Sequence, residues 1–327
     1  NIIRDNIPIY SIGAATMIDN KTGYIFLRRF SATTEKEFVN AVDTLLEQGM
    51  EKLLFDLRGN SGGFLEQAAA ISDQFITTLD TLVYTKGKIK ESNQVFSSTP
   101  KKGNGKLSLI ILINRGSASA SEIVSGAVQD LDRGLIVGET SFGKGLVQRQ
   151  LPLDTGSAIR VTIARYYTPS GRLIQRPFEG SSDLAYYQEL YSINREDKID
   201  SLKELRPKYK TRSGRTVYGG GGITPDIYIP YKNKINEETI KVLRSPKRPF
   251  FNFASKYAIA LDNNFKSFKE FKNNWELSND IINDFLVHLE KDSINVYKDS
   301  LMVDVDYIKN QIKSELAGSI WGKNESA

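Results

Sequence analysis

The sequence predicts an α/β fold, in which strand–helix units build a largely parallel sheet, followed by a small helical domain. Apolar runs that are rich in β-branched residues and end near glycine, such as 107–113 and 135–137, are typical of strands buried on both faces. Segments with apolar residues at helical spacing lie between such runs. Beyond Tyr231 the helical spacing continues without further strand signals. Alternating strands and helices favour a parallel sheet, and the helical remainder favours a second domain.

Four elements are predicted before residue 80. A strand covers 23–30, and a helix over 34–49 opens with a capping-box pattern and ends at glycine. A buried strand covers 52–57, and a second helix covers about 65–76. The apolar face of the first helix consists of Phe38, Ala41, Val42, Leu45 and Leu46.

Composition narrows the classes of function. The chain has 327 residues, enough for one large domain or two smaller ones with an ample core. Its net charge is +5, and the basic residues are scattered along the chain and not gathered in runs. We therefore predict no nucleic-acid partner. No apolar segment is as long as a bilayer-spanning helix requires. The absence of cysteine excludes a cysteine nucleophile, a disulfide framework and a thiolate zinc site.

The single histidine, His288, lies in a segment, 281–290, whose apolar residues share one helical face. A packing role is therefore favoured over a catalytic role. A nucleophilic serine in this chain would need another base. Lysine is the better candidate, because burial can lower its pKa from about 10.4 toward neutrality.

A strand-to-helix junction follows the strand over 107–113. The chain breaks at 114–116 into the small residues 117–121, and helical spacing begins directly afterwards. Free backbone N–H groups and the positive end of the helix dipole collect at such a junction, where they can hold an oxyanion. We therefore predict that Ser119 is a nucleophile. The alternative is structural, because Ser119 and Glu122 have the spacing of a capping box and the hydroxyl can cap the helix.

Lys144 follows the next buried strand and is flanked by Gly143 and Gly145. Because these glycines have no side chains, they leave room for the lysine to approach the serine. We predict that Lys144 is the base for Ser119. Gln148 shares its strand parity, so the two side chains can lie on one face. The alternatives are a solvated loop lysine and an ordinary strand glutamine.

The run from Gly138 to Lys144 also matches most of a phosphate-binding loop. The next residue, Gly145, stands where that motif needs a Ser or Thr ligand for magnesium. The residues after it alternate like a strand and do not open a helix. Nucleotide binding is therefore a weak alternative.

The second half of the sheet domain is less regular. Two strands are predicted over 146–153 and 158–167, and the polar, tyrosine-rich residues 177–215 form an excursion from the sheet. The four glycines at 219–222 indicate a mobile or sterically crowded loop, with a flexible linker as the alternative. A further strand is predicted within 223–230.

Five motifs in a fixed order carry a resemblance to a known family. They are Asp56–Gly63, Gly116–Ile123, Val137–Gln148, Tyr166–Arg172 and Gly222–Asp226. Together they resemble the carboxyl-terminal processing proteases, the S41 serine peptidases, over about 23–230. The excursion and the glycine run resemble versions of the family in Bacteroides-like bacteria.

The resemblance implies hydrolysis of peptide bonds by a Ser-Lys dyad. The nucleophile of the family falls on Ser119, its general base on Lys144, and the residue that orients the lysine on Gln148. Such proteases have a crotonase-like (ClpP/crotonase) α/β core.

The oxyanion hole of the family falls on backbone N–H groups at Ala120 and at Gly62 or Gly63. The match does not decide between the two glycines. The resemblance implies no metal and no cofactor, and protein or peptide substrates that bind in an extended form.

The resemblance also divides the chain. We expect an N-terminal segment over 1–22, left after a missing PDZ domain, a peptidase core over 23–231 and a helical domain over 232–327. By analogy it implies a periplasmic or cell-envelope location. It is also compatible with a lipoprotein anchor outside this stretch and with an oligomer. The main alternative is a non-proteolytic binding protein on the same scaffold.

Overall fold

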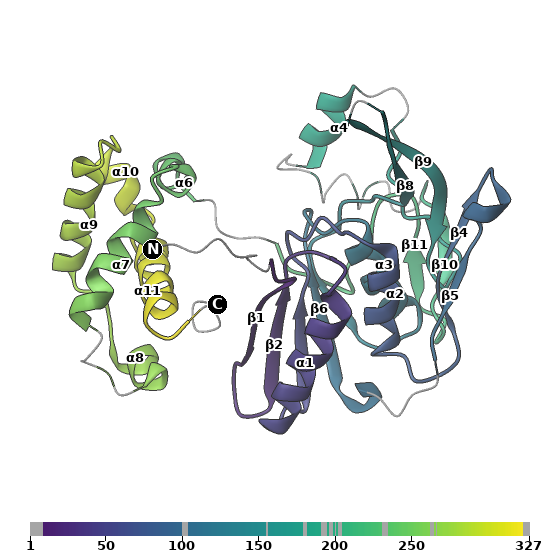
Figure 1. Ribbon diagram of the computed structural model, residues 1–327, viewed down its shortest axis with the longest axis horizontal. Helices are drawn as coiled ribbons and strands as arrows, with labels where there is room; N and C mark the ends of the chain where they lie inside the picture. The colour runs from purple at the N-terminus through teal and green to yellow at the C-terminus, as the bar shows by residue number, and fades with distance from the viewer. Residues whose placement is uncertain are drawn as a thin grey trace. The chain divides into compact units, whose positions relative to one another are not determined.

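The computed structural model describes residues 9–99, 104–154, 156–178, 182–190, 195, 199, 201, 205–230, 235–261, 265 and 267–322. The chain divides into two compact units, Asn1–Pro230 and Tyr231–Ala327. The strands lie in the first unit, and the described part of the second unit is helical (Figure 1).

The first unit is built on a sheet that is parallel except at one edge. Among the described residues the strand order is β1-β2-β3-β6-β7-β12. Within this sheet, as far as the structure describes it, only the pair β1–β2 is antiparallel. The predicted α/β fold with a largely parallel sheet is therefore observed. The strands are β1 Ile12–Met17, β2 Thr22–Leu27, β3 Lys52–Asp56, β6 Ser108–Ile113, β7 Leu135–Gly138 and β12 Ile227–Tyr228.

Strand β1 is missing from the prediction, which sets residues 1–22 apart from the sheet domain. The structure differs, because Ile12–Met17 pairs with β2. The backbone N–H groups of Ser11 and Ile12 also donate to the Glu37 carboxylate, at 2.8 and 3.1 Å. The small residues of this strand lack the alternation that marks a half-buried strand, so periodicity does not find it. Residues 1–8 lie outside the described part.

Three helices follow strands β2, β3 and β6 and flank the sheet (Figure 1). The rings of Phe38, Phe55 and Phe75 lie 5.1 to 6.0 Å apart in the core between helix and sheet. The capping box predicted at Thr34 and Glu37 is not formed, because the helix begins one residue earlier, with Thr33 as its N-cap residue and no side-chain cap hydrogen bond. The helices are α1 Thr34–Glu47, α2 Leu65–Asp73 and α3 Ala120–Asp130.

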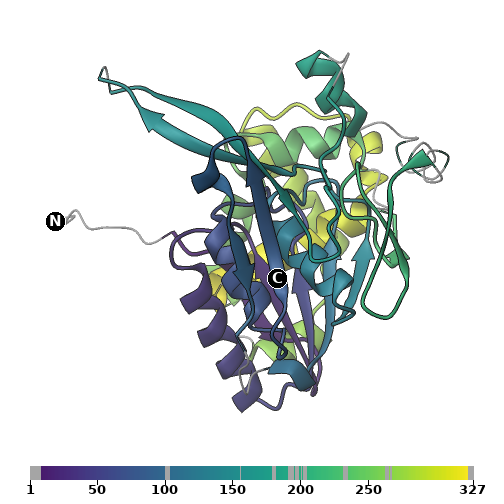
Figure 2. The same ribbon diagram turned by 90° about the vertical axis from the view of Figure 1, so that its right-hand side faces the viewer.

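A second, antiparallel sheet has the order β5-β4-β9-β8 among the described residues. Its β8–β9 hairpin corresponds to the strands predicted over 146–153 and 158–167. Figure 2 shows the hairpin projecting from the body of the unit. The strands are β4 Thr81–Gly87, β5 Val95–Ser97, β8 Leu146–Pro152 and β9 Ala158–Tyr167, and the short 3-10 helices are η1 Lys90–Ser92 and η2 Asn104–Lys106.

The described parts of the excursion contain α4 Asp183–Leu190 and a small hairpin of β10 Lys208–Lys210 and β11 Thr216–Tyr218. The glycine run that follows is crowded. Gly220 N–H donates to the Leu173 carbonyl at 2.7 Å, and a Cβ on Gly222 would lie 2.7 Å from the Ser141 carbonyl oxygen. The crowded-loop interpretation therefore fits, and the strand predicted within 223–230 is limited to β12.

The helical unit has its own aromatic core, in which Phe250 stacks on Phe285 with ring centroids 4.9 Å apart. His288 lies in α9 with only 8% of its surface exposed, and burial lowers its pKa. None of the described helices is long and apolar enough to cross a bilayer. The helices are α6 Glu237–Arg244, α7 Pro249–Leu261, α8 Phe268–Asn274, α9 Asn279–Lys291, α10 Lys298–Met302 and α11 Val305–Ile320.

Candidate active site

A pocket of about 650 Å³ opens in the sheet unit. It is lined by residues of β8 and β9 of the antiparallel sheet, of the N-terminal ends of α2 and α3, and of loop segments such as those that precede the two helices. Five of the six predicted site residues line it, and the sixth, Ala120, directly follows Ser119. The lining residues are Phe30, Ser61, Gly62, Gly63, Phe64, Leu65, Glu66, Ser119, Ile123, Lys144, Leu146, Val147, Gln148, Gln150, Arg160 and Tyr166.

Ser119 occupies the residue position immediately before α3, at the predicted strand-to-helix junction. Its backbone has φ 55° and ψ −112°, a conformation that costs a non-glycine residue free energy. Two contacts hold it there. Its N–H donates to Glu122 Oε2 at 2.8 Å, and the Tyr166 hydroxyl donates to its carbonyl oxygen at 3.1 Å. Strain of this kind occurs at nucleophiles that sit on sharp strand-to-helix turns.

Glu122 joins the serine to the loop that carries the predicted base. The Glu122 carboxylate accepts the N–H groups of Gly143 and Lys144, at 2.6 and 2.9 Å, and the Ser141 hydroxyl. It is fully buried, and burial raises its pKa while these hydrogen bonds act in the opposite direction. Glu122 is thus a bridge between the two halves of the site. In the sequence, the only signal for Glu122 is its capping-box spacing to Ser119.

Lys144 is half-buried and lies two residues before β8 begins. Burial lowers its pKa, the nearby charge of Arg160 lowers it further, and the Glu122 carboxylate partly offsets these effects. Desolvation and a like charge both disfavour the ammonium form, so the neutral amine is more available at a given pH than in a solvated lysine.

Gln148 lies on β8 with an exposed side chain. Among the described residues, Lys144 Nζ makes no hydrogen bond with either Gln148 or Ser119. The structure therefore brings the three residues to one pocket without joining their side chains. The strand that begins at Leu146 also answers the nucleotide-binding alternative, because a phosphate-binding loop requires a helix after its lysine.

The two glycines of the predicted oxyanion hole differ in their bonding. Gly62 N–H donates to Asn60 Oδ1 at 2.9 Å. Within the described structure, the N–H groups of Gly63 and Ala120 have no acceptor. A Cβ on Gly62 would lie 2.8 Å from Ser119 Cβ and 2.9 Å from Ala120 N, so a side chain there would be crowded by the serine.

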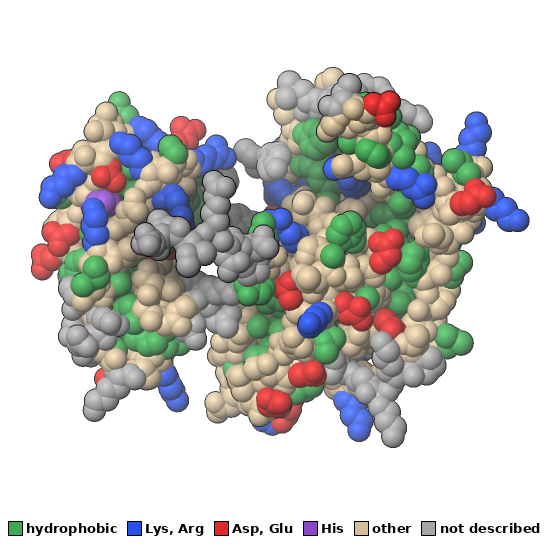
Figure 3. Space-filling model, viewed as in Figure 1, with side chains coloured by type: hydrophobic (Ala, Val, Ile, Leu, Met, Phe, Trp, Pro, Cys, Tyr) green, Lys and Arg blue, Asp and Glu red, His purple; other side chains and the backbone are tan. Residues whose placement is uncertain are grey.

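The excursion from the sheet supports the lysine loop. Arg195, which is 2% exposed, donates to the carbonyl oxygens of Thr140 and Ser141 at 2.7 and 2.6 Å. Tyr186 of α4 and Phe142 pack edge to face, with ring centroids 6.2 Å apart. Figure 3 shows hydrophobic side chains gathered in the region of α4. These contacts fix the backbone on both sides of Ser141.

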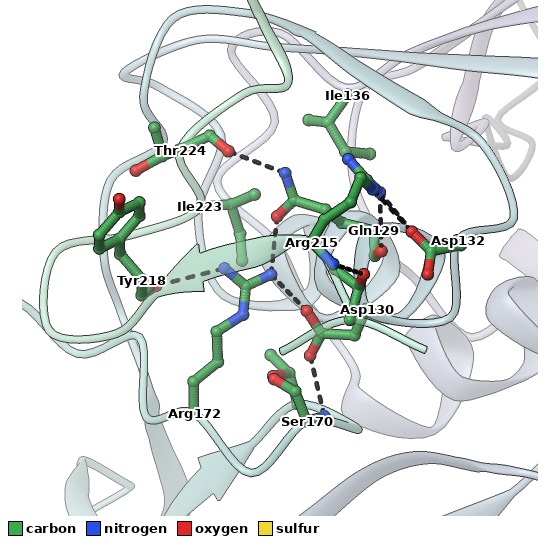
Figure 4. Close-up of polar contacts among 12 residues, drawn as sticks. Gln129, Asp130, Asp132, Ile136, Ser170, Arg172, Arg215, Tyr218, Ile223 and Thr224 are labelled. Carbon is green, nitrogen blue, oxygen red and sulfur yellow. Dashed lines mark hydrogen bonds and ion pairs between the residues drawn. The ribbon is translucent and has the colours of Figure 1, made fainter. Parts of the chain in front are cut away.

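The other end of α3 carries a buried polar cluster (Figure 4). Arg172 Nη2 lies 2.7 Å from Asp130 Oδ1, and both side chains are fully buried. The same guanidinium donates to Gln129 Oε1 at 2.7 Å and to the Tyr218 carbonyl at 3.2 Å. Asp130 Oδ2 also accepts the Ser170 N–H at 3.0 Å. Helix α3 is therefore anchored at its C-terminal end by the segment 170–172, and the Tyr218 carbonyl holds Arg172 in turn.

No group of three or more His, Asp or Glu side chains in the described ranges is arranged to hold a metal ion. The polar side chains of the pocket are two serine hydroxyls, a phenol, an amine, a guanidinium, two amides and one carboxylate, Glu66. This set can support nucleophilic and general-base chemistry from the side chains themselves.

Comparisons with known proteins identify two parts of the chain. Residues 21–180 match the model of peptidase family S41, so this stretch is a peptidase S41 domain. Residues 246–322 match a family of unknown function, DUF8443. The S41 match contains the predicted nucleophile and base, and the second match falls in the helical unit.

The curated relatives are carboxyl-terminal processing proteases. Carboxy-terminal processing protease CtpA of Bacillus subtilis is 36% identical over 54% of this chain and 37% of the relative. The carboxyl-terminal-processing protease of Synechocystis is 41% identical over 45% of this chain and 34% of the relative. The chain thus spans about a third of the length of these relatives.

Two solved structures are similar in part. The photosystem II D1 C-terminal processing protease has 29% identity, covering 59% of this chain and 55% of that chain, with a TM-score of 0.44. A lipoprotein from Streptococcus agalactiae has 15% identity, covering 66% of this chain and 64% of that chain, with a TM-score of 0.41.

Proposed function

We propose that this protein is a serine endopeptidase of the carboxyl-terminal processing type, in which Ser119 is the nucleophile and Lys144 the general base. The observation that carries the proposal is one pocket that holds a strained serine at a helix N-terminus and a lysine whose pKa is lowered. The peptidase S41 domain supports the same chemistry.

In this mechanism, neutral Lys144 removes the proton from Ser119 as the oxygen attacks the substrate carbonyl. The lysine then returns the proton to the leaving amine, and water releases the acyl group by the same steps. Gln148 orients Lys144 in the substrate complex, where side-chain hydrogen bonds of an active site commonly tighten.

The oxyanion is held by the N–H groups of Ala120 and Gly63. We choose Gly63 over Gly62 because the Gly62 N–H already donates to Asn60. Loss of one such donor typically costs about 3 kcal/mol of transition-state stabilisation.

The substrates are proteins or peptides that bind in an extended form, since β8 is an edge strand beside the pocket and offers unpaired backbone groups. We also propose a crotonase-like core, which is supported by the repeated units β2–α1, β3–α2 and β6–α3. A periplasmic or cell-envelope location follows from the family analogy alone.

The proposal is tested by labelling with a serine-reactive fluorophosphonate together with hydrolysis of casein. Wild type should be labelled and active, and both Ser119→Ala and Lys144→Ala should lose both signals while keeping the wild-type circular dichroism spectrum. Casein hydrolysis by Ser119→Ala would exclude the proposed nucleophile. A folded wild type without either signal would favour the non-proteolytic binding protein.

A further inference from the structure

Arg160 lines the same pocket as Ser119 and Lys144, although it lies on the projecting hairpin. In the register of the hairpin it stands directly opposite Gln150. Leu146, Val147, Gln148 and Gln150 of β8 all line the pocket, and the register of the hairpin shifts between Val147 and Gln148. The hairpin therefore presents to the pocket a face that becomes polar toward its tip, with Arg160 beside two glutamines.

Among the described arginines of the sheet unit, Arg160 is not alone in lacking a carboxylate partner, but it supplies the only guanidinium that lines the pocket. Among the described residues it takes part in no ion pair and no hydrogen bond. Its strand-side neighbour Gln150 carries no charge, and the acidic side chain of the pocket, Glu66, comes from α2 and does not pair with it. The arginines that do pair with a carboxylate are Arg58, Arg115, Arg172, Arg176, Arg212 and Arg215.

An unpaired guanidinium at a pocket wall is suited to one kind of ligand group. Its planar fork of N–H donors matches the two oxygens of a carboxylate, and such pairs are stronger than neutral hydrogen bonds. Arg160 is also close enough to the base for its charge to lower the pKa of Lys144. A carboxylate held by Arg160 would therefore lie near the reacting atoms.

We infer that Arg160, with the amide of Gln150, forms a subsite that binds a carboxylate of the peptide substrate close to the cleaved bond. The inference rests on the proposed peptidase function and adds a substrate class to it. The carboxylate is either an Asp or Glu side chain or the free C-terminus of the chain being cut. Arg160 acts on substrate selection, and the bond-making roles remain with Ser119 and Lys144.

The test uses three peptides of one sequence with a fluorescent reporter of cleavage. The first carries Glu near the cleaved bond and an amidated C-terminus, the second carries Gln at that position and an amidated C-terminus, and the third carries Gln and a free C-terminus. Each is measured with wild type, Arg160→Gln and the control Arg149→Gln. Arg149 is exposed on β8 at the opposite parity from Gln148 and Gln150 and does not line the pocket.

We expect wild type and Arg149→Gln to cleave one carboxylate peptide about tenfold more efficiently, in kcat/KM, than the neutral peptide. Arg160→Gln should remove that preference while still cleaving the neutral peptide. The preferred peptide identifies the source of the carboxylate. Measurements are made at a pH where the rate no longer rises, because loss of Arg160 also changes the pKa of Lys144. Equal preference in wild type and Arg160→Gln would overturn the inference.

A binding measurement separates failure of the subsite from failure of the proposed chemistry. The affinity of the same peptides is measured by fluorescence anisotropy with Ser119→Ala and with the double variant Ser119→Ala/Arg160→Gln. A carboxylate preference that disappears with Arg160 supports the subsite even if wild type hydrolyses none of the peptides. No preference in binding or in cleavage would reject the subsite, whatever the outcome of fluorophosphonate labelling.

Discussion

The two ends of α3 differ in how far their polar groups are paired. At the N-terminal end, Ser119 has a strained backbone, and the neighbouring N–H group of Ala120 has no acceptor within the described residues. At the C-terminal end, Asp130 is paired with a fully buried arginine and accepts a further backbone hydrogen bond. At the N-terminal end a backbone donor stays available beside the pocket, whereas at the C-terminal end the polar side chains are paired inside the protein.

The difference shows how a small strained site can persist. Strain of one residue costs on the order of 1–3 kcal/mol and needs surrounding structure that over-determines it. The buried cluster around Arg172 ties the far end of α3 to 170–172 and 218. Glu122, on the same helix, then holds the lysine loop in place by accepting the N–H groups of Gly143 and Lys144. Variants at the two ends should therefore separate activity from stability.

The largest expected effect is on activity, from Lys144→Met. Loss of a general base typically costs 10²–10⁴-fold in rate, so we expect kcat to fall by about 10³-fold. Stability should stay the same or rise, because the variant no longer buries an amine with a lowered pKa. Peptide hydrolysis and urea unfolding measure the two quantities. A large loss of stability would mean that Lys144 is a structural residue.

The next effect is on stability, from Arg172→Met. Breaking a fully buried ion pair by removing one partner should lower the free energy of unfolding by about 3–5 kcal/mol. Molecules that remain folded should keep most of their activity, because the pair does not line the pocket. Adding Asp130→Asn should recover part of the stability, since it removes the unpaired buried charge. Urea unfolding of the single and double variants provides the comparison.

Glu122→Gln should affect both properties to an intermediate degree. An amide keeps one acceptor oxygen and replaces the other with a donor, so either the N–H groups of Ser119 and Lys144 or the N–H group of Gly143 loses its acceptor. We expect kcat/KM to fall by about 10–100-fold and stability by about 1–3 kcal/mol, the cost of buried groups left unsatisfied. The control Ser125→Ala, one turn further along α3, should leave kcat/KM unchanged. Wild-type activity in Glu122→Gln would show that the hydrogen bonds from Glu122 to Ser119 and to the lysine loop are not needed for catalysis.

The smallest effect is on the pH dependence. Activity should rise with pH through the lowered pKa of Lys144, because the neutral amine is the base. Arg160→Gln removes a positive neighbour, so the pKa of Lys144 and the rise in activity should move to higher pH. Glu122→Gln removes a negative neighbour and should move the rise to lower pH. The kcat/KM of a neutral peptide, followed against pH, measures both shifts, and shifts of equal sign would contradict the charge assignments.

The local elements around the site were predictable because each has a strong local signal. The apolar run 107–113, the small residues before Ala120 and the glycines beside Lys144 identify a strand, a helix start and an open loop from neighbouring residues alone. The prediction that this strand is buried on both faces is wrong, because buried residues alternate along it with more exposed ones such as Ile110. Strand β1 was missed because its pairing with β2 is not encoded in its own periodicity. The same holds for Glu122, whose role depends on residues that lie 19 to 22 positions further along the chain.

The α/β class, the helical second part and the two residues proposed as nucleophile and base can be inferred from the residues alone. These features rest on patterns within short windows, where propensity, periodicity and turn chemistry act. The folded structure is needed to show that the Gly62 N–H is occupied, that the Gly63 N–H has no acceptor among the described residues, and that Arg160 lies at the pocket wall without a partner among them. These outcomes depend on burial and on partners distant in the chain, which no local pattern of residues specifies.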